Sequence, residues 1–171
     1  MSDSENQRSF DPASIALRPV TAADDSFLYK VYAGTREPEM ALTGWLPVQQ
    51  QAFLRMQFNL QKESYKDQFP RADHVIILLA GQPVGRMMVD RTSEEEIRGV
   101  DIALLPRSRC SGVGTLLINS LLDEAAKTGK PFRIRVEKYN GRALSLYDRL
   151  GFLKTEEGDT HISMEWQPRQ S

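Results

Sequence analysis

Apolar and polar residues alternate along the chain in patterns that predict strands and helices around one central strand–turn–helix unit. Its strand spans residues 97–105 and ends in a short apolar run that Pro106 closes. A turn that contains two glycines follows at residues 109–114. Apolar residues then recur at helical spacing up to residue 128, and Gly129 suits the left-handed end of that helix.

The same patterns predict the other elements of the fold. Strands are expected at residues 15–20, 74–79, 84–89, 132–136, 152–155 and 162–166. Helices are expected from Thr21 to Tyr32, from Pro47 to just before Pro70, and from Asn140 to Leu150, while residues 34–44 are expected to form a loop. This order predicts an α+β fold, a three-layer α/β sandwich in which a mixed, mostly antiparallel sheet of about six or seven strands is flanked by helices.

Length and composition indicate one globular domain. A chain of 171 residues can bury a sizeable core, so residues 13–168 are expected to form a single domain after a disordered polar tail at residues 1–12. The net charge of −1 gives no reason to expect nucleic acid or an anionic membrane as a partner, and no apolar run is long enough to span a membrane. The tail does not resemble a signal peptide, and a single cysteine cannot form an internal disulfide, so a cytoplasmic location is expected.

The turn between the central strand and its helix has the chemistry of an anion site. The run Arg109-Cys110-Ser111-Gly112-Val113-Gly114 brings free backbone amides and the positive end of a helix dipole to one point, an arrangement that binds phosphate. A Walker-type loop is excluded because no lysine follows Gly114, and a dinucleotide fingerprint is excluded because the third glycine is missing. From these residues alone, the simpler explanation is that the glycines let the helix pack closely on the strand.

A second motif lies about 30 residues downstream and favours a functional role for the turn over a purely structural one. The signature Asn-x-x-Ala-x-x-x-Tyr-x-x-Leu-Gly-Phe is matched by Asn140, Ala143, Tyr147, Leu150, Gly151 and Phe152. The turn itself matches Arg/Gln-x-x-Gly-x-Gly/Ala through Arg109, Gly112 and Gly114. With both motifs in order and Leu104-x-Pro106 upstream, the stretch from residue 101 to residue 152 resembles the GNAT superfamily of N-acetyltransferases.

The resemblance implies acetyl-CoA as cosubstrate and direct transfer of its acetyl group to a primary amine, with no metal. The acetyl-CoA site of the family then corresponds to Leu104, Arg109, Cys110, Ser111, Gly112, Val113, Gly114, Thr115 and Asn140. The resemblance places the pyrophosphate on the amides of the turn and makes Tyr147 the residue that protonates the CoA thiolate. Tyr147 also has the spacing of a core residue, and Asn140 suits a helix N-cap, so each has a structural explanation beside the functional one.

The general base is assigned to Asp101, because it adjoins the apolar end of the central strand. Other acids near strand ends, and a relay through water, remain open; these acids are Asp90, Glu96 and Glu137. Arg98 occupies the position at which some family members carry a glutamate. Neither His74, which starts a strand, nor His161, which lies in the final turn, is well placed by sequence.

The acceptor is expected to be a small-molecule amine that binds near residues 29–45, because the first two helices and their loop shape this pocket in the family. Glu37 and Glu39 suit a cationic amine, whereas Arg36 suits a carboxylate. A protein N-terminus or a lysine side chain remains an alternative acceptor, and a non-catalytic acyl-CoA-binding module is an alternative function. Dimers are common in the family, so the resemblance allows a homodimer, but the sequence identifies no interface.

Overall fold

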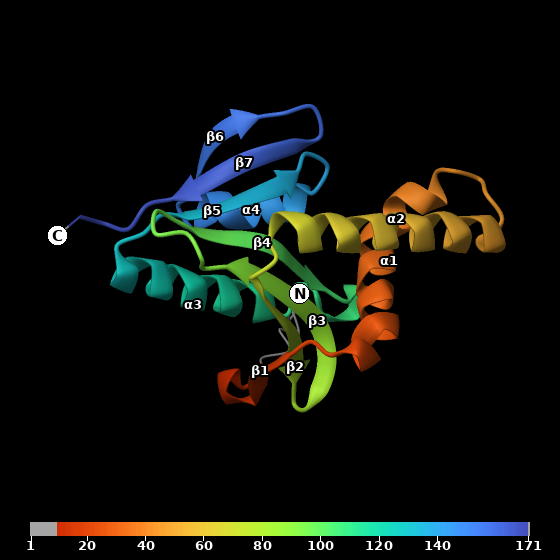
Figure 1. Cartoon of the computed structure of the whole chain (residues 1–171), viewed down its shortest axis with the longest axis horizontal. Coiled ribbons are helices and arrows are strands. Elements are labelled where there is room, and N and C mark those ends of the chain that lie inside the picture. Colours follow the sequence, from red (N-terminus) through yellow and green to blue (C-terminus); the bar gives the residue numbers. More distant parts are fainter. Residues whose placement is uncertain (1–9, 171) are drawn as a thin grey trace, which may run out of the picture. The chain divides into compact units, whose positions relative to one another are not determined.

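The computed structural model describes residues 10–170, which form a seven-stranded mixed sheet flanked by four helices (Figure 1). The strand order is β1-β2-β3-β4-β5-β7-β6. The helices are α1 (Asp25–Ala41), α2 (Pro47–Gln68), α3 (Val113–Thr128) and α4 (Gly141–Arg149). The strands are β1 (Ile15–Pro19), β2 (Asp73–Leu79), β3 (Gln82–Asp90), β4 (Ile97–Leu104), β5 (Phe132–Glu137), β6 (Leu153–Glu157) and β7 (His161–Trp166). The predicted fold class and all seven strands are confirmed.

The chain divides into two compact units, which are described separately. Of the described residues, the first comprises 10–70, 75–86 and 103–114, and the second comprises 71–74, 87–102 and 115–170. Residues 1–9 of the predicted tail lie outside the described residues. Next to them, Asp11 accepts a hydrogen bond from the amide of Ala13 at 2.9 Å and begins a short 3-10 turn over Pro12–Ser14.

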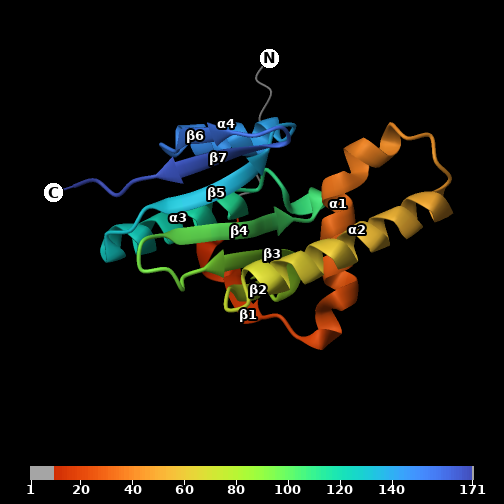
Figure 2. The ribbon, with the colours of Figure 1, turned by 45° about the horizontal axis from the view of Figure 1, so that its top comes forward.

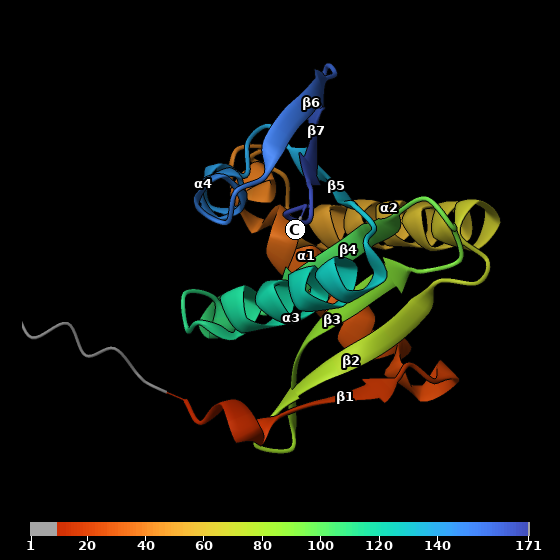
Figure 3. The same cartoon turned by 90° about the vertical axis from the view of Figure 1, so that its left-hand side faces the viewer.

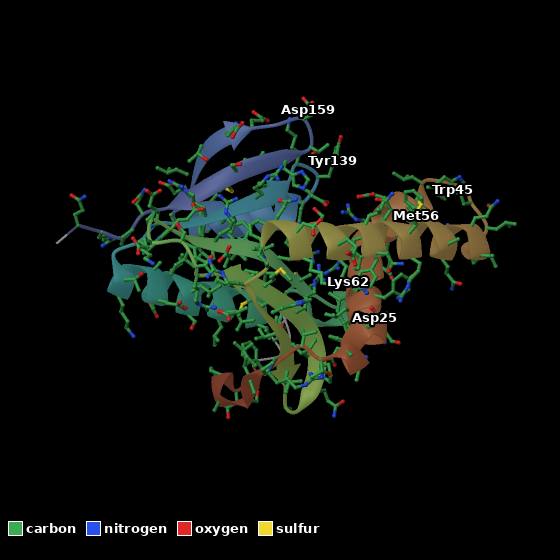
Figure 4. All side chains as sticks on the ribbon, viewed as in Figure 1. Asp25, Trp45, Met56, Lys62, Tyr139 and Asp159 are labelled. Atoms are coloured by element: carbon green, nitrogen blue, oxygen red, sulfur yellow. The ribbon has the colours of Figure 1, made fainter. Side chains whose placement is uncertain are left out.

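In the first unit, α1 and α2 form a hairpin around a shared apolar core. Phe58 of α2 is 1% exposed and packs with Leu28, Tyr32, Met40, Leu54 and Ile76. Ion pairs also join the two helices on their exposed side. Asp25 of α1 accepts hydrogen bonds from Arg55 and Lys62 of α2, the latter at 2.8 Å. Figure 4 shows Asp25 and Lys62 at this junction. The hairpin is therefore fixed by apolar burial inside and by opposite charges outside.

The loop predicted at residues 34–44 is wrong, because α1 continues through it to Ala41. The prediction followed the glycines at both ends of this stretch, and Pro38 lies inside the helix. Met40 explains why the helix nevertheless continues, since its side chain is only 6% exposed and belongs to the α1–α2 core. A further turn of helix buries this apolar side chain, and tertiary burial outweighs the local helix-breaking tendency.

The second unit is built on strands whose two faces differ sharply. On β5 the residues Phe132, Ile134 and Val136 are buried, whereas Arg133 and Arg135 between them are exposed. β7 pairs antiparallel with β5 on one side and with β6 on the other (Figure 3). The apolar face is covered by α4 and the residues after it (Figure 2). There the ring of Phe152 meets Phe132 edge-on, with 6.1 Å between ring centroids.

The opposite face of these strands carries a cross-strand charge network. Arg133 of β5 donates to Glu96 at 2.8 Å and also to Glu165, its register partner on β7. The hydrogen bond from Arg133 lowers the pKa of Glu165 below its ordinary value. This network fixes which side chains of β5 and β7 point away from the apolar face.

The parallel pairing of β4 with β5 is short. It joins Ile97 to Phe132, Arg98 to Arg133 and Gly99 to Ile134, and no register pair follows between the described residues of these strands. Gly99, the last paired residue, lies so close to β5 that an added Cβ would be 2.8 Å from Ile134 Cγ2 and 3.0 Å from Phe132 Cζ. The two strands therefore meet tightly where their pairing ends, at Gly99 and Ile134.

Substitution of Gly99 by alanine should destabilise the protein by about 1–3 kcal/mol, because the methyl group overpacks the point where β4 and β5 meet. Gly141 provides a matched control, since an added Cβ there has no atom within 4 Å and the position begins α4. Gly141→Ala should be neutral or slightly stabilising. Urea titration of both variants checks this, and equal stability of the two would contradict the close approach at Gly99.

Candidate active site

The turn before α3 contains two residues in the left-handed backbone conformation. Cys110 has a φ of 57° and Gly112 a φ of 93°, so both adopt the left-handed region on either side of Ser111. α3 begins at Val113, and the first amides of a helix have no acceptor within the helix. The predicted residues Cys110 to Gly114 therefore form one continuous turn that ends in a helix N-terminus, as the sequence pattern predicts.

Arg109 ties this turn to the end of β4. Its Nε donates to the carbonyl oxygen of Leu104 at 3.2 Å, and the side chain is partly buried. Ser111 Oγ donates to the carbonyl oxygen of Ser108 at 2.7 Å, which closes the turn from within. Both side chains are thus engaged in holding the turn.

A glycine of α1 lets that helix approach the same turn. A Cβ on Gly34 would lie 2.9 Å from Pro106 Cδ and 3.8 Å from a terminal nitrogen of Arg109. The sequence pattern places Gly34 in a loop and therefore does not predict this contact. A glycine within a helical apolar pattern was the available signal, since it commonly marks close packing.

Tyr147 and Asp101 are brought into one electrostatic environment in the second unit. The ring of Tyr147 packs on Phe152 with 5.1 Å between ring centroids. Burial raises the pKa of Tyr147 to about 12, and the negative charge of Asp101 adds to the increase. The phenol therefore stays protonated at neutral pH, so it can donate a proton or a hydrogen bond.

Asn140 caps α4. Its side-chain oxygen accepts a hydrogen bond from the amide of Ala143 at 3.1 Å, which is the structural role the sequence suggested. Any contact with a ligand would therefore use the NH₂ group of the same amide. Thr115, the other predicted residue of the second unit, lies in the first turn of α3.

A cleft of about 180 Å³ opens between α1 and α2 in the first unit. Its apolar wall is made of Tyr32, Met40, Phe53 and Leu54, and its polar groups are Arg36, Glu39 and Gln57. Arg36 donates to Glu39 at 2.9 Å and lies 5.4 Å from the centroid of the Tyr32 ring. The sequence analysis named the α1 residues of this cleft but not those from α2, because only the hairpin brings the two helices together.

His161 was set aside as a turn residue, but it is the first residue of β7 and the register partner of Glu137. Among residues 10–170 no group of three or more His, Cys, Asp or Glu side chains is placed to hold a metal ion. No helix in the same part of the chain is long and apolar enough to cross a membrane.

Comparison with known proteins identifies the fold. The sequence model of the acetyltransferase (GNAT) family matches residues 41–152, which is more than half of the chain. The chain belongs to the acetyltransferase (GNAT) family. The match includes the turn at residues 109–114 and the motif at residues 140–152 on which the resemblance was based. The chain is therefore an acetyltransferase, and acetyl-CoA is its cosubstrate.

Solved structures share the fold of this acetyltransferase at low sequence identity. PaiA N-acetyltransferase from Thermoplasma acidophilum, in complex with coenzyme A, matches with a TM-score of 0.67 at 15% identity, over 90% of this chain and 99% of that one. The ribosomal-protein-S18-alanine N-acetyltransferase from Escherichia coli matches with a TM-score of 0.60 at 18% identity, over 92% and 96%. YncA, a putative acetyltransferase from Salmonella typhimurium with its cofactor acetyl-CoA, matches with a TM-score of 0.56 at 16% identity, over 92% and 96%. No curated protein sequence matches the acetyltransferase closely enough to count as a relative.

The raised pKa of Tyr147 predicts an effect of alkaline pH on stability. A tyrosine in the unfolded chain ionises near pH 10, whereas Tyr147 in the folded protein ionises only near pH 12. The free energy of unfolding should therefore fall between pH 10 and pH 12, by at most about 2–3 kcal/mol, because the tyrosine loses its proton more readily in the unfolded chain than in the folded protein. Tyr147→Phe should lose this part of the alkaline decline, while Tyr139→Phe, at a side chain that is 90% exposed, should retain it. Urea titrations at pH 9 to 12 measure the difference, and identical declines in both variants would contradict the burial of the phenol.

Proposed function

We propose that this acetyltransferase moves the acetyl group of acetyl-CoA to the primary amine of a small molecule. The observation that carries the proposal is the cleft between α1 and α2, whose volume of about 180 Å³ lies below the range of roughly 300–1,000 Å³ typical of sites for drug-sized ligands. A polypeptide acceptor is better served by an extended open groove, so the size of the cleft favours a short acceptor.

The lining of the cleft suits an amine that is cationic in water. Glu39 supplies a carboxylate at the rim, and Arg36 holds this carboxylate in place through its hydrogen bond of 2.9 Å. The apolar wall beneath it would receive the hydrocarbon part of the acceptor. Attraction to Glu39 would raise the local concentration of the ammonium form, and the amine must then lose a proton before it reacts.

The residues predicted for acetyl-CoA have settings that fit such a ligand. The left-handed turn at Cys110 and Gly112 directs backbone amides and the start of α3 toward one point, which suits the negatively charged pyrophosphate. The NH₂ group of Asn140 would donate to an amide carbonyl of the pantetheine arm. Arg109 would act indirectly, by fixing the carbonyl of Leu104 at the end of β4.

Tyr147 would assist departure of the CoA sulfur. Because its pKa is raised to about 12, the phenol keeps its proton at neutral pH and can donate a hydrogen bond. This hydrogen bond would stabilise the negative charge that develops on sulfur as the C–S bond breaks. The charge of Asp101 helps to keep that proton on the phenol. The further role of Asp101 as general base stays a prediction from the sequence.

Release of free thiol from acetyl-CoA tests the function. Small primary amines should support turnover by the wild-type protein, and peptides with a free N-terminus or a lysine should not. Tyr147→Phe should lower kcat by about 10²–10⁴-fold, the range of general acid–base contributions, without changing the Kd for acetyl-CoA in calorimetry. Turnover with peptides alone would overturn the small-molecule acceptor, and binding without turnover on any amine would favour the acyl-CoA-binding module instead.

The assignment of the cleft predicts a selective change in KM. Glu39→Gln removes the rim carboxylate and should raise KM for the amine by about 5–10-fold, since one partly solvated charge interaction is worth about 1 kcal/mol. KM for acetyl-CoA should not change. Glu37→Gln is the matched control, because Glu37 is an exposed acid of the same helix and does not line the cleft. Equal effects of the two substitutions would show that the cleft does not select the amine.

A further inference from the structure

The outer side of α2 carries a row of apolar residues that stay exposed to solvent. Val48, Ala52, Met56 and Leu60 follow one another at intervals of four residues, so they form one continuous row along the helix. All four are exposed, and the accessible fraction is 75% for Val48, 51% for Met56 and 59% for Leu60. Figure 4 labels Met56 on this helix. We call these four residues the α2 ridge.

The α2 ridge lies opposite the face of α2 that is already buried. Leu54 and Phe58 belong to the core of the α1–α2 hairpin. At 3.6 residues per turn these two residues point away from Ala52 and Met56. A helix at a protein surface commonly turns polar side chains to the solvent, whereas a helix that is apolar on two sides is commonly buried on both. The ridge therefore indicates a second contact surface on α2.

The charges around the ridge limit what can cover it. Arg55 and Lys62, which lie beside the ridge, are bound to Asp25 of α1. An anionic membrane surface would require a cationic face next to the apolar row, and these two cations are already paired. Residues 1–9 contain Met1 as their single large apolar side chain, which is too little to cover a row of four residues. An uncharged apolar surface of matching shape is the better occupant.

A second copy of α2 matches the ridge when it lies antiparallel across the first. Rows of residues spaced by four interdigitate in the commonest class of helix packing, in which the axes cross at about 50°. With the two-fold axis halfway between Ala52 and Met56, each Ala52 faces Met56 of the other copy. Each Val48 then faces Leu60 of the other copy. A small residue meets a large one at the crossing, which lets the two helices approach closely.

The polar residues of this face fit the same arrangement. Gln49 and Asn59 flank the ridge and lie opposite one another in the two copies, where their side-chain amides can both donate and accept hydrogen bonds. Glu63 is the next residue on this face toward the end of α2, and it lies beyond the crossing, where the diverging helices leave it in water. The two-fold arrangement therefore brings no like charges together, so the ridge is complementary to itself.

We propose that the protein forms a two-fold dimer through the α2 ridge. The sequence allows a homodimer but identifies no interface, and the exposed apolar row supplies one. The ridge residues do not line the cleft, whereas Phe53 and Gln57 of the same helix do. The dimer would therefore hold α2 from its outer side and leave the lining of the cleft free. The proposal depends neither on the acceptor nor on the chemistry of transfer.

Sedimentation equilibrium of the full chain tests the proposal. The wild-type protein should approach twice its chain mass of 19.4 kDa at micromolar concentrations. Met56→Lys places a charge from each copy at the crossing and should raise the Kd of the dimer by about 100-fold, the effect of losing a central contact in both copies. Leu153→Lys is the matched control, because Leu153 is an apolar residue of β6 that is 72% exposed, and this variant should dimerise like the wild type.

Complementation between two variants tests the antiparallel arrangement. Ala52→Glu should also be monomeric, because it enlarges and charges the same crossing. An equimolar mixture of Met56→Lys and Ala52→Glu should form a mixed dimer, since the introduced lysine of one chain faces the introduced glutamate of the other. Circular dichroism checks that both variants keep their helices, as expected for substitutions at exposed positions.

A wild-type protein that stays monomeric throughout the micromolar range would overturn the proposal. Dimerisation of Met56→Lys as strong as that of Leu153→Lys would also overturn it, because the interface would then lie elsewhere. Variants that remain monomeric in the mixture would contradict the antiparallel two-fold contact. Release of thiol from acetyl-CoA is measured separately, so each of these outcomes leaves the proposed acetyl transfer standing.

Discussion

The site depends on the point at which two parallel strands stop pairing. β4 and β5 share three register pairs and then separate after Gly99 and Ile134. Close contact at Gly99 holds the strands together at one end, so that the separation at the other end is a fixed feature and not a frayed edge.

The alternation of side chains along a strand gives this opening two chemically different sides. Phe132, Ile134 and Val136 direct apolar groups to the face on which Phe152 and Tyr147 pack. The intervening residues of β5 direct charges to the other face, where β7 supplies opposite charges in register. The apolar side explains the pKa of Tyr147, since a phenolate there would lose its hydration. The charged side can accept and release protons, because it remains partly open to water.

The α1–α2 hairpin of the first unit forms the cleft that we propose for the acceptor. Its core forms around Phe58 and includes Met40. Burial of Met40 favours continuation of α1 beyond Gly34 and Pro38, which would otherwise tend to end the helix. That extra helical turn brings Arg36 and Glu39 over the apolar wall of the cleft. A small change in helix length therefore decides whether these charges belong to a solvated loop or to a binding surface.

The order of elements, the glycine-containing turn before α3, the cap at Asn140 and the family could all be predicted from the sequence. These follow from local rules, since hydrophobic period, glycine at positive φ and side-chain caps involve residues that are close in the chain. Three other features depend on the tertiary structure: α1 extends to Ala41, α2 completes the cleft beside α1, and His161 stands opposite Glu137. In each of these cases the partners come from distant segments, and strand register and the burial of shared apolar surface bring them together, which no local pattern encodes.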